Sequence, residues 1–454
     1  MKIKNILLLF ALALLFACEP KIDTVTTTAG DADFTKFVSI GNSLTSGYAD
    51  GDLYKSGQEN SYPAILAKQF EEVGGGEFKQ PLMFDEYGFG NRLLLNAALQ
   101  KPVSAGVTPD PLNFTNIFAD GPYNNMGVPG AKTFHLVVNG YGTLNPYFGR
   151  FASSTSTSVL ADAAAQNATF FSCWIGNNDV LAYAIEGGAA DSITTTQVFS
   201  GALGAVLQTL TANGAKGVIA NIPDITSIPY FSFMNTRLPY KGLVLNATQA
   251  AQLNFAYQQF ELYLASIGIN YSYGFNFVEG PNAFVIEDET IPFPDALGVF
   301  RVRQMKAGEL FLLTLPTDSL LNHGMGSVNT AGPQPLPYGI PDKYILSITE
   351  IQNIKTATTA FNGVIKTYAD QFGLAFVDMN AKLKAIEQVG VTYDGIHFTT
   401  AFITGNSFSL DGVHMTAQGN ALAANYFIDA INAKYGSVIK HVSPRLYPGI
   451  YYYQ

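Results

Sequence analysis

Cysteine, histidine and charged side chains are scarce in this chain, and each scarcity excludes a class of protein. Only two cysteines occur in 454 residues, so we expect no disulfide framework. The five histidines show no His-x-His or His-Glu-x-x-His spacing and no nearby cysteine pair, so no metal and no cofactor is predicted. Charged residues make up 13%, with a net charge of -10, which argues against nucleic acid as a partner.

Long apolar runs are also missing beyond the first residues, so no transmembrane helix is predicted. The exception is the start of the chain, where Lys2 and Lys4 precede the apolar run 6–16. We interpret residues 1–17 as a lipoprotein signal peptide, because Leu15-Phe16-Ala17-Cys18 resembles a bacterial lipobox. Cys18 would then carry lipid and anchor the protein to the bacterial envelope, in our interpretation the outer membrane. A plain secretory peptide with an incidental cysteine is the alternative.

Short apolar runs alternate with amphipathic ones along the rest of the chain. The runs 37–40, 170–173, 217–220 and 374–378 predict strands, and helical spacing recurs at 62–70, 197–212, 246–267, 349–368 and directly after His414. Such alternation predicts an α/β fold with a parallel sheet and helices on both faces. We predict a tether at 18–33, one domain at 34–435 with insertions at about 50–120 and 268–342, and a tail at 436–454.

Ser43 stands in the turn Gly41-Asn42-Ser43-Leu44, directly after the first predicted strand. A hydroxyl there stands clear of a sheet edge, where a nucleophile would be placed. Asp411-Gly412-Val413-His414, near the other end, puts an acid and an imidazole three residues apart. On one helical turn the carboxylate reaches the inner ring nitrogen, and the outer nitrogen faces away. The sequence therefore offers a nucleophile, a base and a group that orients the base.

A second tetrapeptide, Asp394-Gly395-Ile396-His397, has the same spacing and competes for the role of acid and base. We favour His414 because the residues after it lead into a well-patterned helix, which would hold the imidazole rigidly. Bulky and β-branched residues follow His397 instead. We interpret His397 as a residue of the cleft lining or of a solvated loop.

Two further segments supply candidate donors for an oxyanion, Asn125 to Gly130 and Trp174-Ile175-Gly176-Asn177-Asn178-Asp179. A glycine N–H together with an asparagine amide would stabilise the tetrahedral intermediate of acyl transfer. Cys173 lies in the apolar run before the second segment, so we interpret it as a buried small hydrophobe.

These four segments, in this order, resemble the blocks of the GDSL or SGNH hydrolase family. One departure is Asn42, where the family usually has aspartate. The resemblance implies a flavodoxin-like three-layer α/β/α fold with long loop insertions, and a triad of Ser43, His414 and Asp411. It also implies an oxyanion hole of the Ser43 and Gly130 amides with the Asn178 side chain.

The function implied is a serine esterase or lipase that cleaves carboxylic esters through an acyl-enzyme and needs no cofactor. Two alternatives stay open. One is removal of acetyl groups from polysaccharide at the same site. The other is a lipoprotein without enzymatic activity that binds a glycan or a protein through its insertions.

Overall fold

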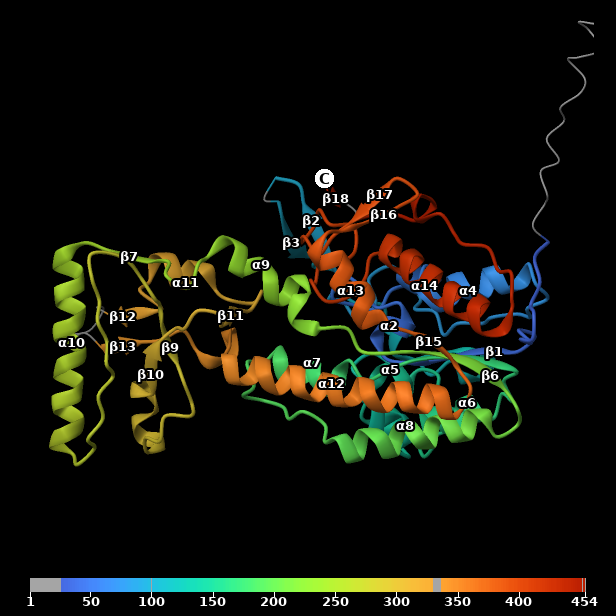
Figure 1. Cartoon of the computed structure of the whole chain (residues 1–454), viewed down its shortest axis with the longest axis horizontal. Coiled ribbons are helices and arrows are strands. Elements are labelled where there is room, and N and C mark those ends of the chain that lie inside the picture. Colours follow the sequence, from blue (N-terminus) through green and yellow to red (C-terminus); the bar gives the residue numbers. More distant parts are fainter. Residues whose placement is uncertain (1–25, 99, 330–335, 451, 454) are drawn as a thin grey trace, which may run out of the picture.

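The structure is a computed structural model that describes residues 26–98, 100–329, 336–450 and 452–453. Cys18 and the predicted signal peptide lie outside these residues. Figure 1 shows two parts side by side, an α/β/α body and a smaller lobe that projects from one end of it. We call residues 238–346 the distal lobe. In the described part of the chain no helix is both long and apolar enough to span a bilayer.

The body is built on a parallel sheet with strand order β15-β6-β5-β1-β4. Its strands are β1 (Phe37–Gly41), β4 (Asn125–Gly127), β5 (Phe170–Trp174), β6 (Lys216–Ala220) and β15 (Ala375–Val377). β1 and β5 are buried at every position, as expected for strands covered on both faces. In chain order the strands run 2-1-3-4-5, so the order reverses between β1 and β5. Ligands of such folds bind at this switch point, at the carboxyl ends of the strands.

Helices cover both faces of the sheet (Figure 1), which confirms the predicted fold class. One face carries α4 (Tyr62–Glu71) and α14 (Ala417–Tyr435), which pack on each other, and α14 also packs on β15. The other face carries α6 (Val159–Ala164), α8 (Thr196–Thr211) and α12 (Ile348–Gln371). Local signals start these helices: the Ser61 and Thr416 side chains cap α4 and α14, and Ser347 and Glu350 form a capping box at α12.

Short helices follow three of the strands at their carboxyl ends. α2 (Ser43–Ser46) follows β1, α7 (Asn178–Ala184) follows β5, and α13 (Met379–Gln388) follows β15. Because the strands are parallel, their carboxyl ends meet at one edge of the sheet. That edge therefore brings together residues from the beginning, the middle and the end of the chain.

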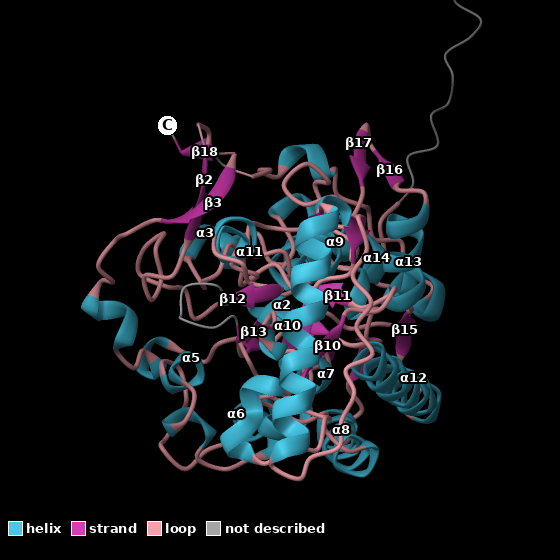
Figure 2. Ribbon diagram, turned by 90° about the vertical axis from the view of Figure 1, so that its left-hand side faces the viewer, coloured by secondary structure: helices cyan, strands magenta, loops and turns pink. Residues whose placement is uncertain are grey.

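The distal lobe has its own apolar clusters, separate from those of the body. Its elements are β7 (Leu243–Leu245), α10 (Ala247–Ser266), β8 (Gly280–Asn282), β9 (Val285–Glu287), β10 (Val302–Gln304), β11 (Leu310–Phe311), α11 (Thr317–Asn322), β12 (Ser327–Asn329), β13 (Leu336–Tyr338) and β14 (Ile345–Leu346). Figure 2 looks onto this lobe, with α10 crossing the view. The insertion predicted at 268–342 therefore begins earlier, because α10 packs its apolar stripe on strands of the lobe.

Three other predicted boundaries differ from the structure. α4 lies within the predicted 50–120 insertion, yet its Tyr62 ring stacks on Phe427 of α14 at 4.6 Å, so it belongs to the body. Residues after it form the added segment, including the hairpin of β2 (Leu93–Asn96) and β3 (Lys101–Ser104). The end of the predicted tether is packed, since Thr28 and Val438 exchange backbone hydrogen bonds. The predicted tail also packs on the body, because Ile439 and Val442 are buried.

Candidate active site

Ser43 is the first residue of α2 and lies in a tight turn after β1. The Asn42 side chain accepts a hydrogen bond from the Leu44 amide at 3.0 Å and so caps this short helix. Gly41 is required here, because a Cβ atom would come within 2.3 Å of the Trp174 carbonyl oxygen on β5. Glycine lets the two strands approach, and the turn presents the Ser43 hydroxyl at the edge of the sheet.

His414 lies directly beside Ser43. Its Nε2 atom is 2.8 Å from Ser43 Oγ, and its Nδ1 atom is 2.9 Å from Asp411 Oδ2. With Nδ1–H donating to the carboxylate, Nε2 has a lone pair free to accept the serine proton. The side chains of His414 and Asp411 are 14% and 13% exposed, so the pair is nearly shielded from water.

The local geometry of this pair differs from the helical turn predicted. Residues 411–414 form a loop that ends before α14, and Gly412 has φ 71°. The loop is closed by backbone bonds: the Ser409 N–H donates to the His414 carbonyl and the Gly412 N–H to the Ser409 carbonyl. Spacing alone could not distinguish this closed loop from one turn of helix, because both bring residues three apart together.

Asp411 remains ionised in this setting. Burial by itself would raise the pKa of its carboxyl group, but the His414 ring and the His414 and Val413 amides lower it below the ordinary value. Asp411 Oδ1 accepts from those two amides at 2.8 and 2.9 Å. A permanent carboxylate at this position holds the His414 ring in one tautomer and stabilises its protonated form.

Three residues that the sequence did not indicate support Asp411 or the loop that carries it. The Ser409 hydroxyl donates to Asp411 Oδ1 at 3.1 Å, and the Gly51 amide donates to Oδ2 at 3.0 Å. Asp50 accepts from the Leu410 amide at 2.9 Å, which ties the acid loop to the segment after Ser43. These residues carry no motif of their own. They lie close to the motifs in sequence, but only the fold places them against one another.

Gly130 occupies a tight turn after β4. The Ala131 N–H donates to the Val128 carbonyl at 3.1 Å, which closes a turn with Pro129 and Gly130 in the middle. Gly130 has φ 78°, the conformation of the third residue of a type II turn, where glycine is favoured. It is exposed, and among the described residues its N–H has no acceptor.

Asn178 links this turn to the site. Its side-chain Nδ2 atom donates to the Ala131 carbonyl at 3.0 Å, and Asn178 lines the same cavity as Ser43 and His414. An amide nitrogen carries two hydrogens, so one remains available to a ligand. The Ser43 N–H is also outside the helical hydrogen-bond ladder, because Ser43 opens α2. The structure thus brings two of the predicted donors, Ser43 and Asn178, to one cavity. The third predicted donor, Gly130, lies in the turn to which Asn178 is hydrogen-bonded.

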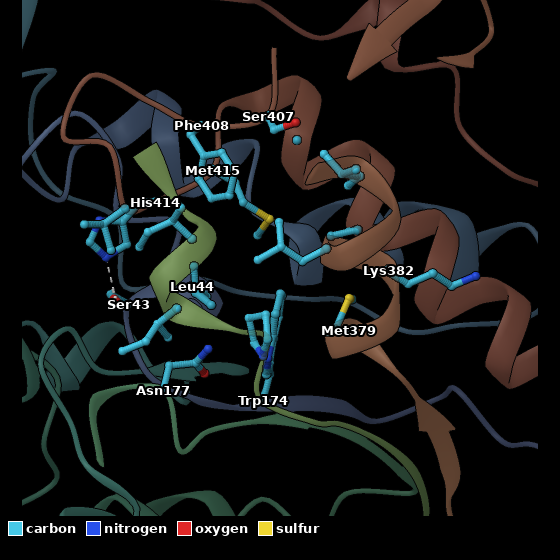
Figure 3. A pocket seen from close by; sticks show the side chains of 18 of the residues that line it. Ser43, Leu44, Trp174, Asn177, Met379, Lys382, Ser407, Phe408, His414 and Met415 are labelled. Carbon is cyan, nitrogen blue, oxygen red and sulfur yellow. Dashed lines mark hydrogen bonds between the residues drawn. The ribbon is translucent and has the colours of Figure 1, made fainter. Parts of the chain in front are cut away.

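An apolar cavity of about 100 Å³ begins at Ser43. Figure 3 shows Ser43 and His414 at one side of it, with Trp174, Met379 and Met415 further along. Its walls come from the segments that follow β1, β5, β6 and β15 and from α14. A long apolar space lined at one end by a hydroxyl, an imidazole and an amide suits a ligand that has one polar group and one apolar arm.

The remaining candidates are not in this cavity. His397 is exposed on β17 (Ile396–Phe398), and its Nδ1 atom lies 2.9 Å from Thr392 Oγ1 rather than beside Asp394. Cys173 is fully buried in β5, and burial raises the pKa of its thiol to about 12. The prediction that Cys173 is a buried small hydrophobe is confirmed.

No family model matches this chain, and no curated protein matches it. Solved structures similar to it include LAE5, an alpha/beta hydrolase enzyme from the metagenome of Lake Arreo, Spain (10% identity, 88% of this chain and 96% of that one, TM-score 0.34). Another is a mutant of Axe2, an acetyl-xylooligosaccharide esterase from Geobacillus Stearmophilus (12%, 88% and 96%, TM-score 0.34). A third is described as a GDSL-like lipase from Parabacteroides merdae (13%, 90% and 100%, TM-score 0.34).

Proposed function

We propose that this protein is a serine hydrolase of the SGNH type that cleaves carboxylic esters. One observation carries the proposal: His414 lies 2.8 Å from Ser43 Oγ and 2.9 Å from Asp411, so nucleophile, base and orienting acid form one connected chain. This is the arrangement that activates a serine hydroxyl, whatever fold supports it.

The chemistry follows from these contacts. His414 Nε2 takes the proton of Ser43 as Oγ attacks the ester carbonyl carbon. The negative charge that develops on the carbonyl oxygen is stabilised by the Ser43 amide, the Asn178 side chain and the Gly130 amide. His414 then gives its proton to the leaving alcohol, which leaves an acyl group on Ser43. A water molecule, deprotonated by His414, releases the acid and restores the hydroxyl.

A labelling experiment tests this proposal. A fluorophosphonate probe should modify the purified protein and fail to modify Ser43→Ala, while Ser192→Ala, which changes an exposed serine, should be labelled like the wild type. Intact-mass measurement and hydrolysis of p-nitrophenyl acetate would be compared for the three proteins. A wild-type protein that neither reacts with the probe nor hydrolyses any ester would favour the non-enzymatic alternative.

The membrane anchor is a separate proposal, which rests on the sequence of residues 15–18. Residues 28–32 pack beside the C-terminal end of α14, where the Asp31 N–H donates to the Tyr435 carbonyl at 2.8 Å. Phe37 and Lys216 are the first residues of β1 and β6. The chain therefore enters the body at the amino ends of the strands, and Ser43 lies at their carboxyl ends. Cys18→Ser should release the protein from the membrane fraction and leave hydrolysis unchanged. Unaltered membrane association of this variant would contradict the proposal.

A further inference from the structure

The cavity beside Ser43 differs from the rest of the site in its lining, which is almost entirely apolar. Near Ser43 it includes the polar side chains of Asn177 and Asn178. Beyond them, Ser407 and Lys382 are the polar members of a wall that consists mostly of apolar side chains, among them Leu44, Trp174, Met379, Leu383, Leu422 and Ala423. A sugar ring would leave its hydroxyl groups without partners against such a wall.

The shape of the cavity is that of a slot. It touches the segments after β1, β5, β6 and β15, which are neighbours in that order in the sheet. Strands lie about 4.8 Å apart, so three spacings give a span of roughly 14 Å. Its volume, about 100 Å³, is nevertheless smaller than that of an engineered cavity of about 150 Å³ that holds benzene. A space that is long and small in volume suits an unbranched chain better than a ring.

The slot also has a defined far end. Lys382 and Tyr426 both line it, and the Lys382 ammonium lies 4.7 Å from the centre of the Tyr426 ring. Figure 3 shows the Lys382 side chain directed away from Ser43. A chain that extended past this point would have to displace the pair or leave the slot for water. The far end therefore limits the length of chain that gains by burial.

The direction of the slot decides which half of an ester it holds. The leaving alcohol must lie next to His414 Nε2, because it receives its proton from that atom. In Figure 3 the slot leaves Ser43 on the side away from the His414 ring, past Leu44 and towards Trp174. The group that runs along it is therefore attached to the carbonyl carbon on the other side, and this group is the acyl chain.

We propose that the slot is an acyl-chain site and that the preferred substrates are esters of unbranched aliphatic acids of about four to eight carbons. This inference rests on the proposed ester hydrolysis at Ser43. It favours aliphatic esters over the acetylated polysaccharide of the alternative, because an acetyl group would leave the slot unfilled.

A series of p-nitrophenyl esters from acetate to palmitate tests the proposal. Each methylene group transferred from water to an apolar wall is expected to raise kcat/KM by about 4-fold until the slot is filled. Hexanoate has four methylene groups more than acetate, so we expect it to exceed acetate by on the order of 100-fold, and we expect palmitate to fall below octanoate. A series that falls steadily from acetate would overturn the acyl site and leave ester hydrolysis itself supported.

Substitutions on α14 locate the effect. Ala423 is 4% exposed and lines the slot, so Ala423→Leu should place a larger side chain in it and lower the octanoate-to-acetate ratio of kcat/KM at least about 10-fold. Ala430 lies on the same helix, is half-buried and is not part of the lining, so Ala430→Leu is the matched control and should keep the wild-type ratio. Equal ratios in the two variants would place the acyl chain elsewhere.

A binding measurement separates this proposal from the catalytic one. Ser43→Ala cannot form an acyl-enzyme, but its slot is intact. Octanoate should therefore bind to it in calorimetry, and Ala423→Leu in the same background should weaken that binding at least about 10-fold. If octanoate binds but the wild type hydrolyses no ester, the acyl-chain site is supported and the proposed ester hydrolysis is refuted. If the wild type hydrolyses esters without a preference for chain length and octanoate does not bind, ester hydrolysis is supported and the acyl-chain site is refuted.

Discussion

Two Asp-Gly-x-His tetrapeptides in this chain share a sequence pattern and have different structures. Asp394 and His397 belong to the hairpin of β16 (Val391–Tyr393) and β17, where Asp394 and Gly395 form the connection. Both have positive φ, 46° and 78°, as a type I′ hairpin turn requires. His397 then pairs across the strands with Thr392, and the Asp394 carboxylate accepts from Ser443 instead. Acid and imidazole do not meet.

Asp411 and His414 lie in a closed loop and not in a hairpin. Only Gly412 has positive φ, and the chain closes on itself between Ser409 and His414 before α14 begins. The carboxylate stays inside the loop, accepts from two loop amides and reaches the ring. The difference shows that in this chain the Asp-x-x-His spacing brings acid and imidazole into contact only where the backbone folds back. A hairpin with the same spacing sends the two side chains to different partners.

The sharpest test of this comparison is to remove each imidazole. His414→Ala should lower kcat by about 10⁴-fold or more on a chromogenic ester, because without the base the Ser43 hydroxyl is not activated. His397→Ala should stay within about twofold. The double variant Ser43→Ala, His414→Ala should lose little more than either alone, because members of one catalytic unit are not additive. An inactive His397→Ala with an active His414→Ala would reverse our assignment.

The acids should differ almost as strongly. Asp411→Asn keeps the size of the side chain but loses the charge that orients His414, so we expect kcat to fall by about 10³- to 10⁴-fold. Asp394→Asn, the same change in the hairpin, should have no measurable effect. Both would be measured with one ester at saturating concentration. Comparable losses in the two variants would mean that the hairpin also serves the reaction.

The two neighbouring asparagines extend the comparison to the oxyanion donors. Asn178→Ala should lower kcat by about 10²- to 10³-fold with little change in KM, because its amide acts on the transition state. The Asn177 side chain accepts a hydrogen bond from Asn42 at 3.4 Å, which supports the turn, so we expect Asn177→Ala to be far milder. Similar values for both variants would show that the donor block is misplaced.

The lowered pKa of Asp411 predicts a pH-dependent stability. A carboxylate whose pKa is depressed in the folded protein stabilises it above the unfolded value of about 3.9, and this stabilisation is lost as pH falls through the folded value. Asp411→Asn should therefore be less stable by about 2 kcal/mol at pH 7, and the difference should shrink below pH 4. Urea unfolding at both pH values would measure it. A difference that stays constant with pH would contradict the shift.

The smallest expected effect comes from the residues that hold each tetrapeptide. Ser409→Ala removes the hydroxyl that donates to Asp411, and we expect a loss in kcat of about 3- to 10-fold, because one hydrogen bond to a charged group is removed. Thr392→Val removes the corresponding contact of His397 and should leave kcat unchanged. Steady-state kinetics of the two variants would show whether the hydrogen bond to Asp411 affects kcat and the one to His397 does not.

Much of the body could be predicted from the sequence, because its signals are local. The strands 37–41, 170–174 and 216–220 are apolar runs, and the caps Ser61, Ser347 and Thr416 precede helices that their own periodicity indicates. β4 was not predicted as a strand, since Asn125-Met126-Gly127 lacks an apolar run and pairs only because β1 lies beside it. The boundary of the distal lobe was also misplaced, because the apolar stripe of α10 does not reveal which core it joins.

The sequence by itself determined the residue types of the site, their order, and the turns that hold Ser43 and Gly130. Tertiary structure alone decided which histidine faces Ser43, since that contact joins residues 371 positions apart. It also placed Ser409, Gly51 and Asp50 behind Asp411, and it left a slot between α13, α14 and the edge of the sheet. The reason is physical: short-range patterns fix backbone conformation, whereas contacts between distant residues depend on the order in which the strands pair.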